Sequence, residues 1–457
     1  MDILSIEQLK KLWMGLKTDN SFTKNLAITF SGNAIGQVLG FIFTPFIARA
    51  YGPEPYGTFA LFTAVASNFA LVSTFQLPTG YVSSANKREL HVVMQFTFFV
   101  LLFFTALSIL LVIFYRQAFL DFFDAGNLHV LVYFIPVYVF LMGSDYILHG
   151  WNIYVKEFSR GAVAKITSVV ASKSVTLLYG LVAPSATGLV IGNLLVYPLE
   201  SAFKLSKRIR SEFSSVIEWG GWDEMKGVIK RFRSYPLLVT PGLLITNLNG
   251  QLPVFCFSLY FQQANVGLFA LANSLITVPI SVITNSTTTV FLQKAAETRK
   301  SDPARLKDLV LSLHKKLFLI CFLPLTIFAF ISEWVFSFAF GAAWHEAGVF
   351  AAFLSISTIL AVPQQPLSVL FRLMHREYYN LLLNIASIFL RVAGLALGVF
   401  YHDIKIAVAG YALATILTMA ISLIIIFNMV KIRAWQVAGY LFAVLIAFVV
   451  VVLQKLW

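Results

Sequence analysis

The sequence is divided into thirteen long apolar stretches, and this feature constrains the fold more than any other. Most are about twenty residues long, the length that an α-helix needs to cross the hydrocarbon core of a bilayer. Membrane-spanning β-strands are about ten residues long and alternate in polarity, so a β-barrel is not expected. The sequence predicts an all-α polytopic membrane protein with 12–13 transmembrane helices. The stretches are 23–48, 57–77, 90–114, 128–148, 162–184, 187–203, 236–261, 265–291, 309–331, 347–371, 379–400, 406–427 and 436–454.

The composition indicates the same class of protein. Charged residues make up 12% of the 457 positions, about half of the roughly 25% that is usual in soluble domains. Such a chain lacks the polar side chains to cover a water-facing surface, and its 44 phenylalanines suit a lipid-facing one. We assign the net charge of +13 to loops on one side of the membrane, so nucleic acid is not an expected partner.

The distribution of Lys and Arg between the connecting segments predicts the orientation. With the N-terminus in the cytoplasm, 25 of the 34 basic residues fall in cytoplasmic segments and 4 in outer segments. Membrane proteins concentrate Lys and Arg in their cytoplasmic loops. The asymmetry therefore predicts a cytoplasmic N-terminus, with 204–234 and 292–308 in the cytoplasm and 332–346 outside.

The stretches group into two halves joined by one long, charged connection. Whether the last stretch, 436–454, crosses the membrane is left open. The expected parts are an interfacial amphipathic N-tail at 1–22, an N-lobe of six helices at 23–203, a cytoplasmic linker at 204–234, a C-lobe of six helices at 235–427, and a basic loop with the thirteenth stretch at 428–457.

An internal repeat supports the division into halves. The sequence YGTFALFTAV at Tyr56–Val65 matches VGLFALANSL at Val266–Leu275 with an offset of 210. Both segments lie at the start of the second helix of their half. Because each half has an even number of helices, both begin on the cytoplasmic side, which predicts a pseudo-twofold axis along the membrane normal. The identical pairs are Gly57/Gly267, Phe59/Phe269, Ala60/Ala270 and Leu61/Leu271.

The sequence contains no recognisable motif of an enzyme. It has no P-loop, no HExxH and no Ser, His and Asp at a recognisable catalytic spacing. Its two cysteines, Cys256 and Cys321, lie in apolar stretches and have no partners at metal-site spacing. We therefore expect a transporter that has no cofactor and no metal site.

Two basic residues at the centres of apolar stretches are the sharpest functional signal. Lys173 lies at the middle of 162–184, and Arg391 lies close to the middle of 379–400. A charge at a helix centre costs about 2.5–3.5 kcal/mol on insertion scales. Both belong to the fifth helix of their half, so they are expected at matching depth, facing one aqueous cavity that binds an anion such as pyrophosphate. The alternative is that each pairs locally, for example with Glu200 or Asp145.

A second group of candidates consists of amide side chains in the first helix of each half. These amides either hold helices together or hydrogen-bond sugar hydroxyls in a wet cavity. Arg49, at the outer end of the first helix, either lines the exit of the cavity or anchors at the headgroups. The amides are those of Asn33, Gln37, Asn247, Asn249 and Gln251.

One stretch resembles a known family. FIARAYGPEPYGTFAL at Phe46–Leu61 resembles the polysaccharide and O-antigen flippase (Wzx-type) family of the multidrug/oligosaccharidyl-lipid/polysaccharide (MOP) exporter superfamily. The shared features are an Ala-Arg motif that ends the first helix, a Gly-x-x-x-Tyr-Gly turn and an apolar second helix. Val266–Leu271 and Ile276–Thr284 resemble the start of the second lobe of the same family. The thirteenth stretch departs from the usual twelve helices of that family.

The resemblance implies a flippase in the bacterial inner membrane. Such a protein moves a lipid-linked oligosaccharide, carried on undecaprenyl pyrophosphate, from the inner to the outer leaflet by alternating access between two lobes. Its partners are this substrate and membrane lipid. The driving force is left open, with coupling to H+ or Na+ as candidates. The family binds its anionic substrate with basic cavity residues, and Lys173 and Arg391 match that role here.

Two other functions remain open at this point. A multidrug or cation antiporter of the same superfamily requires carboxylates at the membrane midplane, whereas Asp145 and Glu200 lie near helix ends. A membrane-embedded glycan polymerase or ligase generally has catalytic groups on long outer loops. The longest outer connections in this sequence are 115–127 and 332–346, which are short.

Overall fold

A computed structural model of the chain describes residues 21–122, 129–205, 221–302, 304–433 and 435–456. The described part is built of helices and contains no β-strand, which confirms the predicted all-α class. The long helices, in chain order, are α2 (Ser21–Tyr51), α3 (Pro53–Val72), α4 (Lys87–Phe122), α5 (Phe134–Val155), α6 (Phe158–Val182), α7 (Ala186–Lys204), α10 (Thr240–Tyr260), α11 (Gln263–Ser301), α12 (Arg305–Phe340), α13 (His345–Leu367), α15 (Tyr378–Phe400), α16 (Ile404–Met429) and α17 (Trp435–Leu456).

Short helices fill several of the connections between the long ones. The N-tail predicted at 1–22 lies outside the described residues except for its last two positions. Residues 206–220 of the predicted linker also lie outside the described residues. The short helices are η1 (Leu77–Ser83), η3 (Leu131–Tyr133), α9 (Trp222–Arg231), η4 (Tyr235–Val239), η5 (Ala342–Trp344) and α14 (Val369–Leu373).

The helices match the predicted apolar stretches one for one. Eleven segments of the described part are long and apolar enough to cross a membrane. They include Ala186–Lys204, which corresponds to the short stretch 187–203. The structural helices extend beyond several predicted stretches because charged residues at their ends continue the helix. At about 1.5 Å per residue, the 39 residues of α11 make a rod almost twice as long as the hydrocarbon core is thick.

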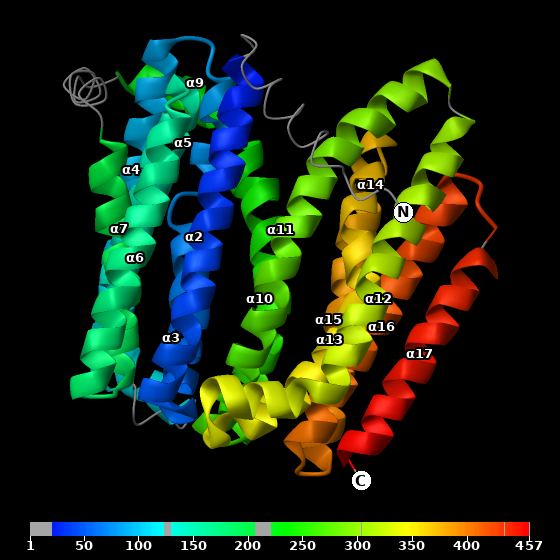
Figure 1. Cartoon of the computed structure of the whole chain (residues 1–457). Helices are drawn as coiled ribbons and strands as arrows, with labels where there is room; N and C mark the ends of the chain where they lie inside the picture. Colours follow the sequence, from blue (N-terminus) through cyan, green and yellow to red (C-terminus); the bar gives the residue numbers. More distant parts are fainter. Residues whose placement is uncertain (1–20, 123–128, 206–220, 303, 434, 457) are drawn as a thin grey trace.

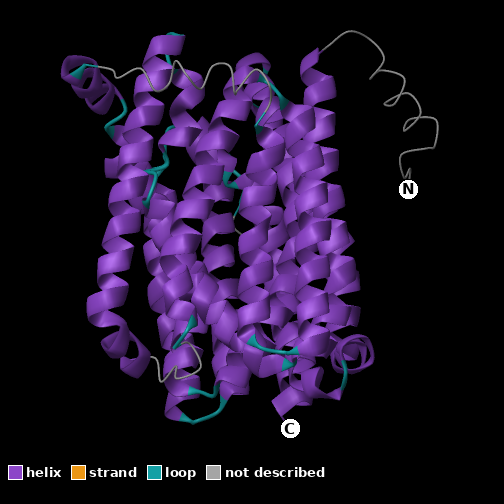
Figure 2. Ribbon diagram, turned by 90° about the vertical axis from the view of Figure 1, so that its left-hand side faces the viewer, coloured by secondary structure: helices purple, strands orange, loops and turns teal. Residues whose placement is uncertain are grey.

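The long helices form two groups that stand side by side. The helices from α2 to α7 form one group, and those from α10 to α17 form the other (Figure 1). All of them run roughly parallel to one direction (Figure 2). Large apolar side chains cover the outside of the molecule; for example, Phe114 is 74% exposed and Phe389 is 71% exposed. Such a surface is the one expected of a protein whose solvent is lipid.

Within the first group, α2 packs closely on α6. Gly32 and Gly36 lie on the face of α2 that meets α6. A Cβ atom at Gly32 would lie 2.3 Å from the Cβ of Ala162, and one at Gly36 would lie 3.0 Å from the Cγ of Lys165. Small residues at such a crossing let two membrane helices approach until their backbones nearly touch.

The two groups meet where α3 and α11 begin. A Cβ atom added to Gly57 would lie 1.9 Å from the carbonyl oxygen of Gln263, and one added to Gly267 would lie 1.9 Å from that of Pro53. Only glycine lets the two helices pack backbone to backbone at this point.

The last helix, α17, ends beside α12, where Lys455 approaches Phe330 and Glu333. The Nζ atom of Lys455 lies 3.3 Å from an oxygen of Glu333 on α12. Residues Ala438–Leu456 are also long and apolar enough to cross a membrane. The stretch 436–454, whose crossing the sequence left open, therefore qualifies as a membrane-spanning helix by its length and composition.

The charged linker contains an amphipathic helix that is tied to the first group. From α9, Arg231 pairs with Glu89 at 2.6 Å and donates a hydrogen bond to the carbonyl oxygen of Ser83 at 2.8 Å. Arg88 pairs with Glu224 at 3.0 Å. These contacts attach the described end of the linker to the start of α4.

Candidate functional site

Arg391 lies in the middle of α15 and is held by two other helices. Its Nη1 donates to the carbonyl oxygen of Asn249 at 3.2 Å and to the Oδ1 of the same residue at 3.0 Å. Its guanidinium lies over the ring of Tyr411, 4.9 Å from the centroid. Its Nε is buried and has no hydrogen-bond partner among the described residues. The arrangement fixes the orientation of the cation but leaves its charge without a carboxylate partner in the described chain.

Lys173 lies in the middle of α6, the fifth long helix of the first group. The side chain is half-buried, and no other described residue forms a hydrogen bond or ion pair with it. The alternative of a local pair with Glu200 or Asp145 is wrong, because those carboxylates pair with other lysines. Lys173 is therefore a second cation that the described chain leaves without a carboxylate partner.

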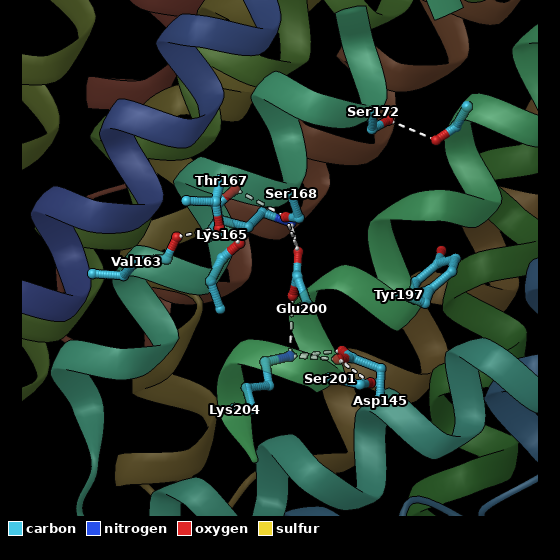
Figure 3. A network of polar contacts seen from close by, with 12 residues as sticks. Asp145, Val163, Lys165, Thr167, Ser168, Ser172, Tyr197, Glu200, Ser201 and Lys204 are labelled. Carbon is cyan, nitrogen blue, oxygen red and sulfur yellow. Dashed lines mark hydrogen bonds and ion pairs between the residues drawn. The ribbon is translucent and has the colours of Figure 1, made fainter. Parts of the chain in front are cut away.

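A four-residue ionic network occupies the interface of α5, α6 and α7 (Figure 3). Lys204 lies 2.6 Å from Asp145 and 3.0 Å from Glu200, and its side chain is only 3% exposed. The other oxygen of Glu200 lies 3.0 Å from Lys165 and accepts a hydrogen bond from Ser168 at 3.2 Å. Two cations meet two carboxylates, so the network is electrically neutral. Such close pairing offsets the cost of burying four charges.

This network is not part of the prediction from the sequence. That prediction placed Lys165 inside an apolar stretch and Lys204 at the start of the linker. The signal that could have found the network is the spacing of Glu200 and Lys204, which lie one helical turn apart on α7. The contacts to Asp145 and Lys165 come from other helices, so spacing in the sequence could not have revealed them.

The candidate amides of α10, those of Asn247, Asn249 and Gln251, differ in their contacts and surroundings. Asn249 binds Arg391, so two of the candidate residues lie in direct contact. The Nδ2 of Asn247 donates to the Oδ1 of Asn68 on α3 at 3.1 Å, which links the two groups of helices. Gln251, one turn beyond Asn247, is half-buried.

The candidate amides of α2 are Asn33 and Gln37, and among the described side chains no hydrogen bond joins Gln37 to Arg391 or Lys173. Gln37 is half-buried, and its Oε1 is buried without a hydrogen-bond partner in the described chain. The side chain of Asn33 lies outside the described part. Gln37 is the next residue after Gly36, which contacts Lys165 of α6.

Arg49 connects the two groups at the end of α2. Its Nε donates to the carbonyl oxygen of Ala339 at 3.0 Å, and its Nη2 donates to that of Phe338. These are among the last carbonyl groups of α12, which have no partner within their own helix and attract a cation. Arg49 therefore binds a helix end of the other group, a role that neither sequence interpretation described.

An aromatic contact reinforces the connection made by Arg49. The Nε1 of Trp344 in η5 donates to the carbonyl oxygen of Ala48 at 3.1 Å. The ring of Tyr56 meets the ring of Trp344 edge to face at 5.3 Å. Trp344 is 1% exposed, so this contact is dry. Together with the Gly57–Gly267 contact, these bonds join the groups on the side that the charge distribution predicts to be outside.

Comparisons with known proteins agree with this architecture. A family model described as polysaccharide biosynthesis protein matches residues 46–349. None of the curated proteins matches the sequence.

Several solved structures share the fold. An inward-facing multidrug resistance MATE family transporter of the MOP superfamily superposes with a TM-score of 0.66, at 15% identity, covering 88% of this chain and 96% of the other. The lipid II flippase MurJ in an inward closed conformation gives a TM-score of 0.62, at 15% identity, with 92% and 97% covered. A MOP superfamily transporter from Pyrococcus furiosus gives 0.55, at 13% identity, with 89% and 96% covered. These likenesses establish the MOP transporter fold.

Proposed function

The chain belongs to the polysaccharide biosynthesis protein family, and on that premise we propose that it is a flippase for a lipid-linked oligosaccharide. The proposed substrate is an oligosaccharide on undecaprenyl pyrophosphate, which the protein moves from the inner to the outer leaflet of a bacterial inner membrane for synthesis of a surface polysaccharide. Support comes from the family match and from the fold shared with transporters, one of which is a lipid II flippase.

The observation that carries this proposal is the contrast between paired and unpaired charges. Asp145, Glu200, Lys165 and Lys204 neutralise one another. Lys173 and Arg391 lie in the middle of their helices and have no carboxylate partner among the described residues. An uncompensated charge at that depth is costly, and its retention in each group favours an anionic ligand that neutralises both.

The shape of the Arg391 site suits a phosphate-bearing ligand. Asn249 and Tyr411 hold the guanidinium from two sides. The side chain is therefore already ordered and loses little conformational entropy when a ligand binds. A planar guanidinium donates two parallel hydrogen bonds to a phosphate. Lys173 supplies a mobile point charge from the other group. The pyrophosphate would be held between them, while neighbouring amides such as that of Gln251 would contact the sugar.

The interlobe contacts suggest how alternating access proceeds. Arg49, Trp344 and the Gly57–Gly267 pair hold the two groups together at the predicted outer end. We propose that these contacts close the outer side while substrate enters from the cytoplasm, and that they break when the lobes rock to release it outside.

A cation antiporter is less well supported by this geometry. It requires a carboxylate that is free to hold a proton or a sodium ion. The two carboxylates of the α5–α7 interface are already neutralised by Lys165 and Lys204. We therefore assign this network to holding the first group together rather than to ion coupling.

The direct test is the leaflet distribution of the substrate in cells. In cells that lack the protein, lipid-linked oligosaccharide should accumulate in the inner leaflet, protected from glycan-modifying reagents added outside. Re-expression should return it to the outer leaflet. If the substrate reaches the outer leaflet at an unchanged rate without the protein, the proposed function is wrong.

A further inference from the structure

A pocket lies between α11 and α12, away from the residues discussed above. Its volume is about 420 Å3. Two lysines enter it from facing helices, Lys294 from α11 and Lys316 from α12. Hydroxyl side chains, including that of Ser312, and apolar side chains, including Val290 and Leu313, form the rest of its wall. The pocket therefore combines a cationic part with an apolar part.

The two lysines have no counter-charge within the described chain. Both are exposed, and no other described residue forms an ion pair or hydrogen bond with either. Two ammonium groups that face one pocket repel each other unless an anion lies between them. The pocket is thus suited to an anion.

The depth of the pocket points to the headgroup region of the cytoplasmic leaflet. Lys294 lies seven residues before the end of α11, and Lys316 lies eleven residues after the start of α12. At 1.5 Å per residue these distances are about 10 and 16 Å from the helix ends. The connection between α11 and α12 belongs to the basic segment predicted to be cytoplasmic. Basic pockets between membrane helices on that side bind anionic lipid headgroups.

We propose that this pocket binds the phosphate of an anionic membrane phospholipid between Lys294 and Lys316, with the acyl chains against the apolar wall. The pocket lies within one pair of consecutive helices of a single lobe, so it moves with that lobe as the protein changes conformation. A transported substrate, by contrast, must pass between the lobes. The bound lipid would therefore be a resident of the C-lobe, and its binding does not depend on the proposed flippase activity.

The experiment measures lipid retention by the intact protein. The full chain is purified in a neutral detergent, mixed with phosphatidylglycerol or with phosphatidylcholine, and examined by native mass spectrometry. Wild type should retain phosphatidylglycerol in preference to phosphatidylcholine. The double variant Lys294→Gln/Lys316→Gln should bind phosphatidylglycerol roughly thirtyfold more weakly, from the usual contribution of two lysines near an anionic leaflet.

Two matched variants make the result specific to this pocket. Lys300→Gln/Lys307→Gln removes the same charge from exposed positions of the same segment and should bind as wild type does. Lys294→Arg/Lys316→Arg retains both cations and should also retain the lipid. The proposal would be overturned if the Lys300→Gln/Lys307→Gln variant lost as much phosphatidylglycerol binding as the Lys294→Gln/Lys316→Gln variant, or if the latter lost none.

A third arm separates a phospholipid from the transported substrate. Undecaprenyl pyrophosphate without sugar is added to the protein that has bound phosphatidylglycerol. If the phospholipid is resident, it should remain bound. Displacement of one phosphatidylglycerol by one undecaprenyl pyrophosphate, abolished in the Lys294→Gln/Lys316→Gln variant, would assign the pocket to the substrate and contradict the phospholipid proposal. A failure of the flipping assay would leave this result unaffected.

Discussion

Gly57 and Gly267 lie backbone to backbone at the start of α3 and α11, and their contact is reciprocal. A Cβ at Gly57 would meet the carbonyl oxygen of Gln263, and a Cβ at Gly267 would meet that of Pro53, each at 1.9 Å. Both glycines and their contact partners are related by the offset of 210 that relates the repeats. A contact in which residue i meets j and j meets i is the signature of a twofold axis. The relationship is consistent with the pseudo-twofold that the sequence predicted.

This contact predicts a specific sensitivity to one methyl group. Gly57→Ala should destabilise the folded protein by about 1–3 kcal/mol, because the helices must separate to accommodate the Cβ. Gly250→Ala is a matched control, since a Cβ at Gly250 on α10 would meet nothing within 4 Å. Thermal unfolding in detergent measures both variants. Equal melting temperatures for the two would show that the close approach does not contribute to stability.

Arg49 is predicted to hold the outer end closed. Arg49→Ala removes the donors to the carbonyl groups of Phe338 and Ala339, so the outward-open population should increase. A cysteine at Asn247, between the lobes, reports this change in a background without Cys256 and Cys321. Its labelling by an impermeant thiol reagent added outside should rise severalfold. Arg116→Ala, on α4, should leave the labelling unchanged, and a similar rise in both variants would contradict the assignment.

The ionic network predicts that removing one charged side chain destabilises the protein more than removing two of opposite charge. Lys204→Met leaves Asp145 without a cation and should cost about 3–5 kcal/mol of stability. Adding Asp145→Asn to Lys204→Met should recover part of this loss, because Glu200 retains Lys165. The readout is folded protein in the membrane and its melting temperature. If the double variant is less stable than Lys204→Met, the buried pair is not the source of the effect.

The predicted topology gives a test that does not involve transport. A cysteine at Glu333, near the turn between α12 and α13, should react with an impermeant thiol reagent in whole cells. A cysteine at Lys300, at the end of α11 that precedes α12, should react only after the membrane is opened. The reverse pattern would invert the orientation and place the Arg49 contacts on the cytoplasmic side.

Local sequence patterns were sufficient to predict the helices but not the contacts between them. Each apolar stretch is long enough to specify a helix without help from its neighbours, because the bilayer forces the backbone to satisfy its own hydrogen bonds. The repeat marked Gly57 and Gly267 but gave no indication that they touch. Arg391 was recognisable from its depth, whereas its partners Asn249 and Tyr411 come from helices distant in the sequence.

Charged residues near helix ends were the hardest to interpret. The sequence pattern assigned Lys204 to a cytoplasmic linker, yet its side chain is buried and bonded to two carboxylates. Position in the sequence cannot distinguish a lysine that extends into water from one that turns back into the bundle. Arg49 posed the same problem, because its partners are carbonyl groups, which every residue possesses.

The central claim is that Lys173 and Arg391 together bind the anionic part of a transported lipid. Its most direct test is the rate at which the purified protein, reconstituted in liposomes, moves an undecaprenyl pyrophosphate-linked oligosaccharide between leaflets. We predict that Lys173→Ala and Arg391→Ala each abolish transport at equal reconstituted amounts, that Arg391→Lys retains part of it, and that the double Ala variant is little worse than either single one. Wild-type rates in both Ala variants would contradict the claim and show that the two cations are structural.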